Sequence, residues 1–150
     1  MAASIWDNSV RASIAERAQR VTPDAAPRWG KMNASAMMAH MNDALRMALG
    51  ELRVTSKNLR PMQLKPIRKL VIYYLPIPKG APTAPELIAR CPTAVLDDEK
   101  RAFAELMHRL GAVRPDSPLG EHPLFGNLSY DEFGALIAKH SDHHLRQFGV

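Results

Sequence analysis

Three of the six histidines lie close together near the end of the chain, at positions 140, 143 and 144. At about 100° per residue of a helix, His140 and His144 fall within about 20° of the centre of the apolar stripe, and His143 lies at its edge. Two imidazoles one turn apart on a core-facing surface have the spacing of a helical metal-ligand pair. A metal ion would offset the cost of burying them, but the same pair could instead be histidines bonded to backbone or water.

A third ligand must come from another segment, and His40 in the stretch Met37-Met-Ala-His40-Met-Asn-Asp43 is the candidate. His40 lies at the border of an apolar helix face, and Asp43, one turn on, is a candidate partner for its ring N–H. His122, in a loop, is a candidate fourth ligand or substrate contact, whereas His108 is expected at the surface. Three histidine ligands leave a position for water or substrate, and imidazole suits zinc, nickel, iron or copper.

Helical periodicity dominates the segments that must position these histidines. We expect helices over about 8–20, capped by Asp7, and over about 34–53, capped by Asn33. A later helix begins after Asp97 or Asp98 and stops at Gly111. The last one begins with the capping box Ser129-Tyr-Asp-Glu132 and runs to about Phe148.

The stretch 57–92 holds seven of the twelve prolines. Pro66 could open a short helix through Tyr74, whereas the prolines that follow force residues 77–86 into an extended conformation. With no repeat and no second core, the pattern predicts one all-α domain over residues 1–150. We expect a four-helix bundle with a Pro-rich irregular connection and a short extra helix.

Composition excludes several classes of protein. Cys91 is the single cysteine of the 150 residues, so a disulfide-stapled scaffold is excluded, and its setting before Pro92 favours a structural role. No apolar run approaches the roughly 20 residues of a membrane span, and the first residues do not resemble a secretory signal. The net charge of +5 is mild, and the basic stretch from Lys57 to Lys69 carries no nucleic-acid motif. We expect a cytoplasmic protein that binds neither nucleic acid nor membranes.

His40 followed much later by His140-Ser-Asp-His143-His144-Leu-Arg-Gln147 resembles the pattern of the DinB-like (DinB/YfiT) metalloprotein superfamily. The framing segments Arg28-Trp-Gly-Lys-Met32 and His122-Pro-Leu-Phe-Gly-Asn-Leu128 resemble one uncharacterised branch of it, known only as a domain of unknown function. Matching segments run from about residue 7 to 149. The resemblance implies a metal triad of His40, His140 and His144, with His143 outside it.

The characterised members of that superfamily include transferases and isomerases that use bacillithiol, mycothiol or glutathione. The resemblance therefore implies a divalent metal ion, a low-molecular-weight thiol and a small-molecule substrate. A cation lowers the pKa of a bound thiol or water, which suits a metal-dependent transferase or hydrolase acting on a small electrophile. The 57–92 segment departs from the superfamily and is expected to reshape the mouth of the pocket.

Two functions remain open from the sequence. In an enzyme, Asp43 and His143 would assist the metal site, and His122 and Gln147 would contact the substrate. The alternative is a non-catalytic metal- or ligand-binding stress protein with the same three-histidine site. A pocket beside an open coordination position would favour the enzyme, and a site closed by His122 would favour the alternative.

Apolar residues cover about half of the predicted second helix, which is wider than one packing partner requires. A helix central to the bundle accounts for this width, and we prefer that interpretation slightly to a face shared in a homodimer. The residues concerned are Met37, Met38, Met41, Leu45, Leu49 and Leu52.

Overall fold

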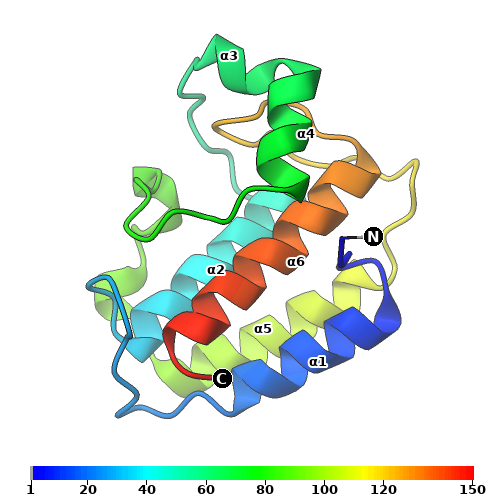
Figure 1. The fold of residues 1–150 in the computed structure, drawn as a ribbon. Helices are drawn as coiled ribbons and strands as arrows, with labels where there is room; N and C mark the ends of the chain where they lie inside the picture. The colour runs from blue at the N-terminus through cyan, green and yellow to red at the C-terminus, as the bar shows by residue number, and fades with distance from the viewer. Residues whose placement is uncertain (1) are drawn as a thin grey trace.

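A computed structural model describes residues 2–150, which fold into helices without any β-strand. The predicted all-helical class is therefore confirmed. Four long helices account for most of the regular structure, and four short ones lie in the Pro-rich stretch (Figure 1). The long helices are α1 (Asn8–Gln19), α2 (Ala34–Ala48), α5 (Leu96–Leu110) and α6 (Tyr130–Gln147). The short ones are α3 (Arg60–Gln63), α4 (Lys65–Tyr73) and the 3₁₀ turns η1 (Pro85–Leu87) and η2 (Cys91–Thr93).

The long helices pack pairwise around a shared hydrophobic core. Helix α5 contacts both α1 and α2, and α6 also contacts both, so α2 and α6 lie side by side although they are far apart in the sequence (Figure 1). The largest side chains in the core include Phe103 from α5, Phe133 from α6 and Met37 from α2. The neighbouring positions of α2 and α6 are what bring distant histidines together.

Helix α6 begins as the sequence predicts. The Ser129 hydroxyl accepts a hydrogen bond from the Glu132 amide, and the Glu132 carboxylate accepts one from the Ser129 amide. This reciprocal pair satisfies two amides that the first turn leaves free, which fixes the start of the helix. At the start of α2, Asn33 likewise accepts from the Ala36 amide, as predicted.

Two predicted helix boundaries are wrong. Helix α2 ends at Ala48 rather than near residue 53, because the chain turns at Gly50 with φ +77° and the amides of Glu51 and Leu52 bond back to the Arg46 carbonyl. Helix α5 is capped by Val95, so Asp97 and Asp98 lie inside its first turn. There their negative charges interact favourably with the N-terminal end of the helix dipole.

The Pro-rich stretch is more helical than its composition suggests. Helix α4 matches the predicted short helix, but α3 and the two 3₁₀ turns were not predicted. Helix α4 packs on α6 and is held there by Arg68, which pairs with Glu132 at 3.0 Å, and by Lys139, which donates to the Val71 and Leu75 carbonyls. Helix α4 is thereby fixed against α6, and its Val71 and the following Leu75 line the same cavity as His140 and His144.

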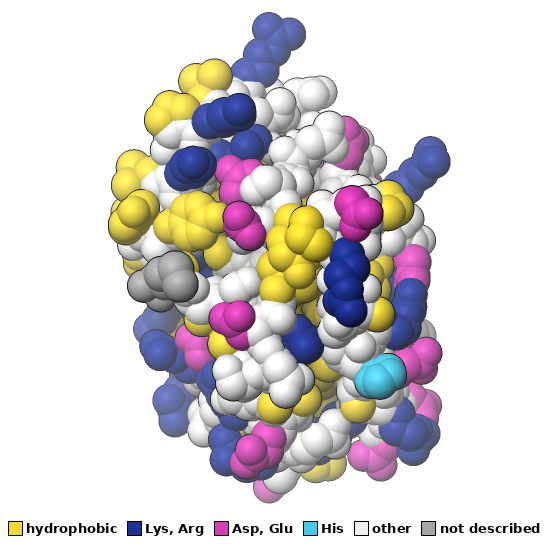
Figure 2. All heavy atoms as spheres, turned by 90° about the vertical axis from the view of Figure 1, so that its right-hand side faces the viewer, with side chains coloured by type: hydrophobic (Ala, Val, Ile, Leu, Met, Phe, Trp, Pro, Cys, Tyr) yellow, Lys and Arg dark blue, Asp and Glu magenta, His cyan; other side chains and the backbone are white. Residues whose placement is uncertain are grey.

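The outer surface of α3 and α4 combines apolar and basic side chains. Leu64, Leu70 and Tyr74 are exposed, and Lys65 and Lys69 lie among them. Figure 2 shows hydrophobic and Lys or Arg side chains intermixed toward the top of the molecule, the end at which α3 and α4 lie in Figure 1. No helix among residues 2–150 is long and apolar enough to cross a membrane.

Helix α2 is enclosed on nearly every side by its own chain. Met37, Met38, Met41 and Leu45 are all fully or almost fully buried in the core. This is the burial expected of a helix central to the protein. The width of its apolar face therefore gives no reason to invoke a second subunit.

Candidate metal centre

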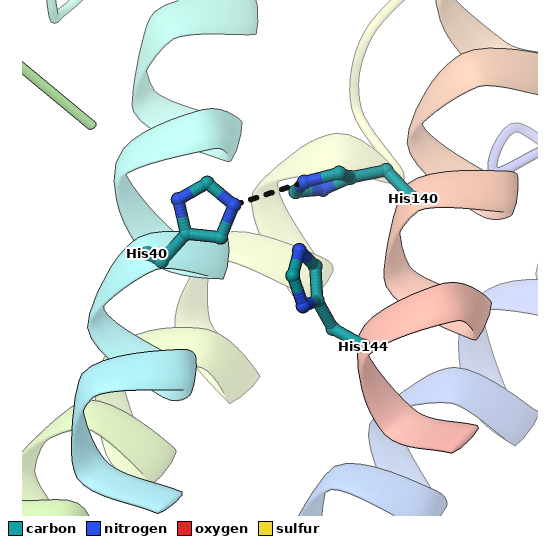
Figure 3. Close-up of side chains that lie close together, drawn as sticks. All are labelled: His40, His140 and His144. Atoms are coloured by element: carbon teal, nitrogen blue, oxygen red, sulfur yellow. Dashed lines mark hydrogen bonds between the residues drawn. The ribbon is translucent and has the colours of Figure 1, made fainter. Parts of the chain in front are cut away.

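Helices α2 and α6 bring three histidines into one cluster. His40 projects from α2, and His140 and His144 project toward it from successive turns of α6 (Figure 3). The Nε2 atoms of His40 and His140 are 3.1 Å apart, and each of the three residues offers a ring nitrogen within 4.8 Å of the others. The ring centroids are separated by 4.6–5.0 Å, with the rings tilted edge to face. The three residues that the sequence singled out thus do converge.

Hydrogen bonds at the far side of two rings fix how they face the cluster. His40 Nδ1 lies 3.0 Å from the Leu87 carbonyl, and because a carbonyl only accepts, the proton is on Nδ1 and the lone pair is on Nε2. His144 Nδ1 lies 2.9 Å from Gln147 Oε1. The Gln147 amide in turn donates to the Trp29 carbonyl at 2.6 Å, which orients Oε1 as the acceptor. His144 therefore also presents an unprotonated Nε2.

This arrangement fits a divalent metal ion of the transition series. Two nitrogens at about 2.0–2.1 Å from one tetrahedral zinc ion would lie roughly 3.3 Å apart, close to the separation of the His40 and His140 nitrogens. Ligating histidines usually donate their other ring N–H to a carbonyl or carboxylate, as His40 and His144 do here to a backbone carbonyl and an amide oxygen. The set of three imidazoles suits zinc, nickel or iron and does not by itself choose among them.

Burial keeps all three histidines in the neutral form that binds metals. Desolvation lowers the pKa of His144 to about 3, with the nearby His40 adding to the effect. It also places the pKa of His140 well below the ordinary value, helped by repulsion from the other histidines. For His40, burial lowers the pKa although its bond to the Leu87 carbonyl acts in the opposite direction. The cluster is therefore uncharged at pH 7, with lone pairs available for a cation.

The cluster borders a cavity of about 420 Å³. All three histidines line it, together with Trp29 and Phe125. Most residues of the Pro-rich stretch between Leu75 and Leu87 also line it, so this segment does shape the pocket as the sequence led us to expect. The walls are mainly apolar, and their polar groups come chiefly from histidines and lysines, which is the usual composition of a small-molecule site.

His122 is not the fourth ligand that its position in the sequence suggested. Its Nδ1 accepts hydrogen bonds from the amides of Leu124 and Phe125, at 3.1 and 3.3 Å. The residue lines the same cavity but does not belong to the cluster of converging nitrogens. Burial lowers its pKa to about 4, so it stays neutral and carries its proton on Nε2.

The other predicted helpers have different contacts from those expected. Asp43 does not bond to His40, because its carboxylate accepts from Arg46 and Arg90 instead. Gln147 was a candidate substrate contact, and both polar atoms of its side chain are instead used to orient His144 and to hold Trp29. His143 stays outside the cluster, as predicted, and packs between the rings of Trp29 and His144.

Two backbone carbonyls that position the site could not be identified from the sequence. Leu87 orients His40, and Trp29 orients Gln147, but a carbonyl oxygen is present at every residue and leaves no mark in the sequence. Arg90 was also missed, and it ties the chain beyond η1 to α2 and α5 through Asp43 and Glu99. Its contacts depend on the path of an irregular loop.

Cys91 has the environment of a structural residue, as the sequence indicated. Its thiol donates to the Ala36 carbonyl at 3.2 Å, where it helps to join η2 to α2. Burial raises the pKa of this thiol, and the nearby Asp43 adds to the rise. A thiol held protonated is a poor nucleophile.

Comparison with known proteins identifies a family. Neither the curated proteins nor the solved structures contain a significant match to the chain. A family described as a protein of unknown function, DUF1569, matches residues 13–149, which include all three histidines of the cluster. Because this match extends over nearly the whole chain, the protein belongs to the DUF1569 family.

Proposed function

We propose that this protein binds a divalent transition metal through His40, His140 and His144 and uses it to activate a thiol or water against a small electrophile. The observation that carries the proposal is the convergence of three neutral imidazoles on one cavity, two of them oriented by hydrogen bonds at Nδ1. Without a metal ion, His140 Nε2–H donates to His40 Nε2. A metal ion bound between the rings would replace that proton and use the unprotonated Nε2 of His144 as well. We further propose that the four long helices form a DinB-like bundle and that the chain is a single domain.

The cavity favours an enzyme over a protein that only stores or senses a metal. Three histidine ligands would leave a coordination position of the metal ion free for a fourth ligand, and the adjoining cavity is large enough to admit a small molecule. His122 does not close the site, since its Nδ1 is occupied by two backbone amides. A transferase or a hydrolase would both use such an opening.

Each part of the site has a task in this proposal. A bound divalent metal ion would supply Lewis acidity and lower the pKa of a thiol or water molecule beside it. The Leu87 carbonyl and Gln147 hold two of the ligands in the correct tautomer, while the apolar wall limits the access of bulk water.

His143 is suited to accept the proton that an activated thiol or water molecule would release. It lines the cavity, and neither of its ring nitrogens has a hydrogen-bond partner within residues 2–150. Burial lowers its pKa, which keeps the ring neutral and able to take up a proton at pH 7.

Cobalt substitution tests the open position directly. The protein would be loaded with Co²⁺ and its visible spectrum recorded before and after addition of 2-mercaptoethanol, with His40→Ala as the control. We expect a d–d spectrum that depends on His40, and a new sulfur-to-cobalt charge-transfer band with the thiol. Azide, a small anion that binds open metal positions, would be added in a separate titration. If neither the thiol nor azide altered the cobalt spectrum, the site would be closed, and the non-catalytic alternative would be favoured.

A further inference from the structure

The charged residues that line the cavity are all basic. They are Lys31, Lys57 and Lys139, and no aspartate or glutamate is among the lining residues. Five of the six histidines also line it, and none of the three in the cluster has a carboxylate as a hydrogen-bond partner. The fixed charges in the lining of the cavity are therefore all positive.

These lysines differ from the arginines in having no acidic partner. Every ion pair among residues 2–150 has an arginine as its cation. Lys139 donates to the Val71 and Leu75 carbonyls at 2.7 and 2.6 Å, which leaves one N–H of its ammonium group unused. Lys31 and Lys57 are exposed, and Lys57 is anchored by its backbone amide to the Pro123 carbonyl.

Two further groups add one positive charge and one neutral N–H donor at the cavity. Lys79 lies 4.6 Å from the ring centroid of Trp29, itself a lining residue, in a cation–π contact. His122 uses its Nδ1 to accept from two amides, so its Nε2 is an N–H donor. The hydrogen bonds of the His122 ring to other residues of the described part of the chain are both at Nδ1.

We propose that the cavity selects small organic anions, and specifically carboxylates that carry an apolar body. Basic groups around a low-dielectric cleft concentrate anions there and repel cations. The apolar Pro-rich wall would hold the body of the ligand, while Lys31, Lys57 and Lys139 attract its carboxylate. The inference rests on the proposed function for the site's chemistry and adds the substrate class, because a bound metal cation would strengthen the same selection.

A matched set of three ligands tests this charge selection. The probes are 3-phenylpropanoate, 3-phenylpropanamide and 3-phenylpropylamine, which share one apolar body and differ in charge. Calorimetric titration at low salt would compare them on the zinc-loaded protein and on the protein stripped with a chelator. We expect the carboxylate to bind about tenfold more tightly than the amide in both forms, and the amine to bind most weakly.

Lysine variants locate the source of the preference. In Lys31→Gln/Lys57→Gln, the carboxylate should lose about tenfold in affinity while the amide is unaffected. The control Lys65→Gln/Lys69→Gln changes the net charge equally at exposed positions of α4 that do not line the cavity, and it should retain the preference. Lys139 is left intact because it also holds the end of α4.

Several results would overturn the inference: equal affinity for acid and amide, no measurable binding of any probe, or equal losses in the two double variants. A preference found only in the zinc-loaded protein would also overturn it, because the metal and not the lysines would then select the anion. If the protein bound no zinc at all but still preferred the carboxylate to the amide, the inference would be supported and the proposed metal site would be contradicted.

Discussion

Helix α2 contributes to two buried polar clusters within one turn of each other. His40 belongs to the histidine cluster, and Asn42 and Asp43 belong to an ionic cluster that also contains Arg46, Arg90 and Glu99. In the ionic cluster, Arg90 bonds to Asp43 at 2.9 Å and to Glu99 at 2.6 Å. Every charge there has an opposite charge from the same chain.

The histidine cluster contains no opposite charges of this kind. The far-side nitrogens of His40 and His144 have partners, but the nitrogens that face one another have only each other. Burial alone would raise the pKa of Glu99, yet hydrogen bonds from Arg90 and Asn42 outweigh it and keep the carboxylate charged. The histidines accept no hydrogen bond from a cation and bond to no carboxylate, and although the nearby Asp43 favours the charged form of His40, burial outweighs it and the pKa values of the histidines fall. The charges of the ionic cluster are therefore satisfied within the chain, whereas the histidine cluster could hold a metal ion.

Removal of Glu99 should give the largest change in stability. In Glu99→Ala, Arg90 keeps its pairing with Asp43 and the Asn42 amide keeps its bond to the backbone carbonyl of residue 99, but both lose their bonds to the buried carboxylate. Because bonds to a charged group are the strong ones, we expect the free energy of unfolding to fall by about 3 kcal/mol. Urea denaturation measures this loss, and Glu105→Ala, an exposed glutamate of the same helix, is the control. A loss below about 1 kcal/mol would show that the ionic cluster is not structural. Metal stoichiometry should be unchanged.

Protonation of His122 should weaken the metal-free protein at low pH. Its folded-state pKa of about 4 lies below the roughly 6.5 of an unfolded histidine, so the unfolded chain takes up the proton first. The stability present above pH 6.5 is thus lost as the pH falls toward 4, by about 2 kcal/mol between pH 7 and 5.

The variant His122→Asn isolates that contribution. Asparagine can accept from the same two backbone amides and does not titrate. Chemical denaturation at pH 7 and pH 5 should show a smaller loss in the variant than in the wild type, by about the 2 kcal/mol assigned to His122. Equal losses in both proteins would contradict the lowering of the His122 pKa by burial.

Gln147 should affect the affinity for metal more than the number of ions bound. Gln147→Leu removes the acceptor that orients His144, and loss of such a partner typically weakens metal binding about 10- to 100-fold. Gln147→Glu keeps an acceptor oxygen and should recover most of the affinity. Competition with a chromophoric chelator measures the difference. If the glutamate variant were as weak as the leucine variant, the orienting bond would not be the cause.

The sequence predicts best what depends on local pattern. The capping box of α6 and the shared face of His140 and His144 follow from spacing within one helix, and both are present in the structure. His40 could be nominated because its helix was recognisable and few other histidines competed with it. The pairing of Asp43 with Arg90 was missed because it depends on the route of the chain between η1 and α5. The same uncertainty hid Leu87, whose carbonyl is placed by that route.

The most direct test of the account is the metal content of the purified protein and its histidine variants. Plasma mass spectrometry would be applied to protein prepared without a His tag or chelator: wild type, His40→Ala, His140→Ala/His144→Ala, and the exposed control His108→Ala. We expect about one equivalent of a divalent metal in the wild type and the control, and none in the other two variants, which should still fold. An absence of metal from the wild type after reconstitution with zinc, nickel or iron, or its retention in His40→Ala, would contradict the account.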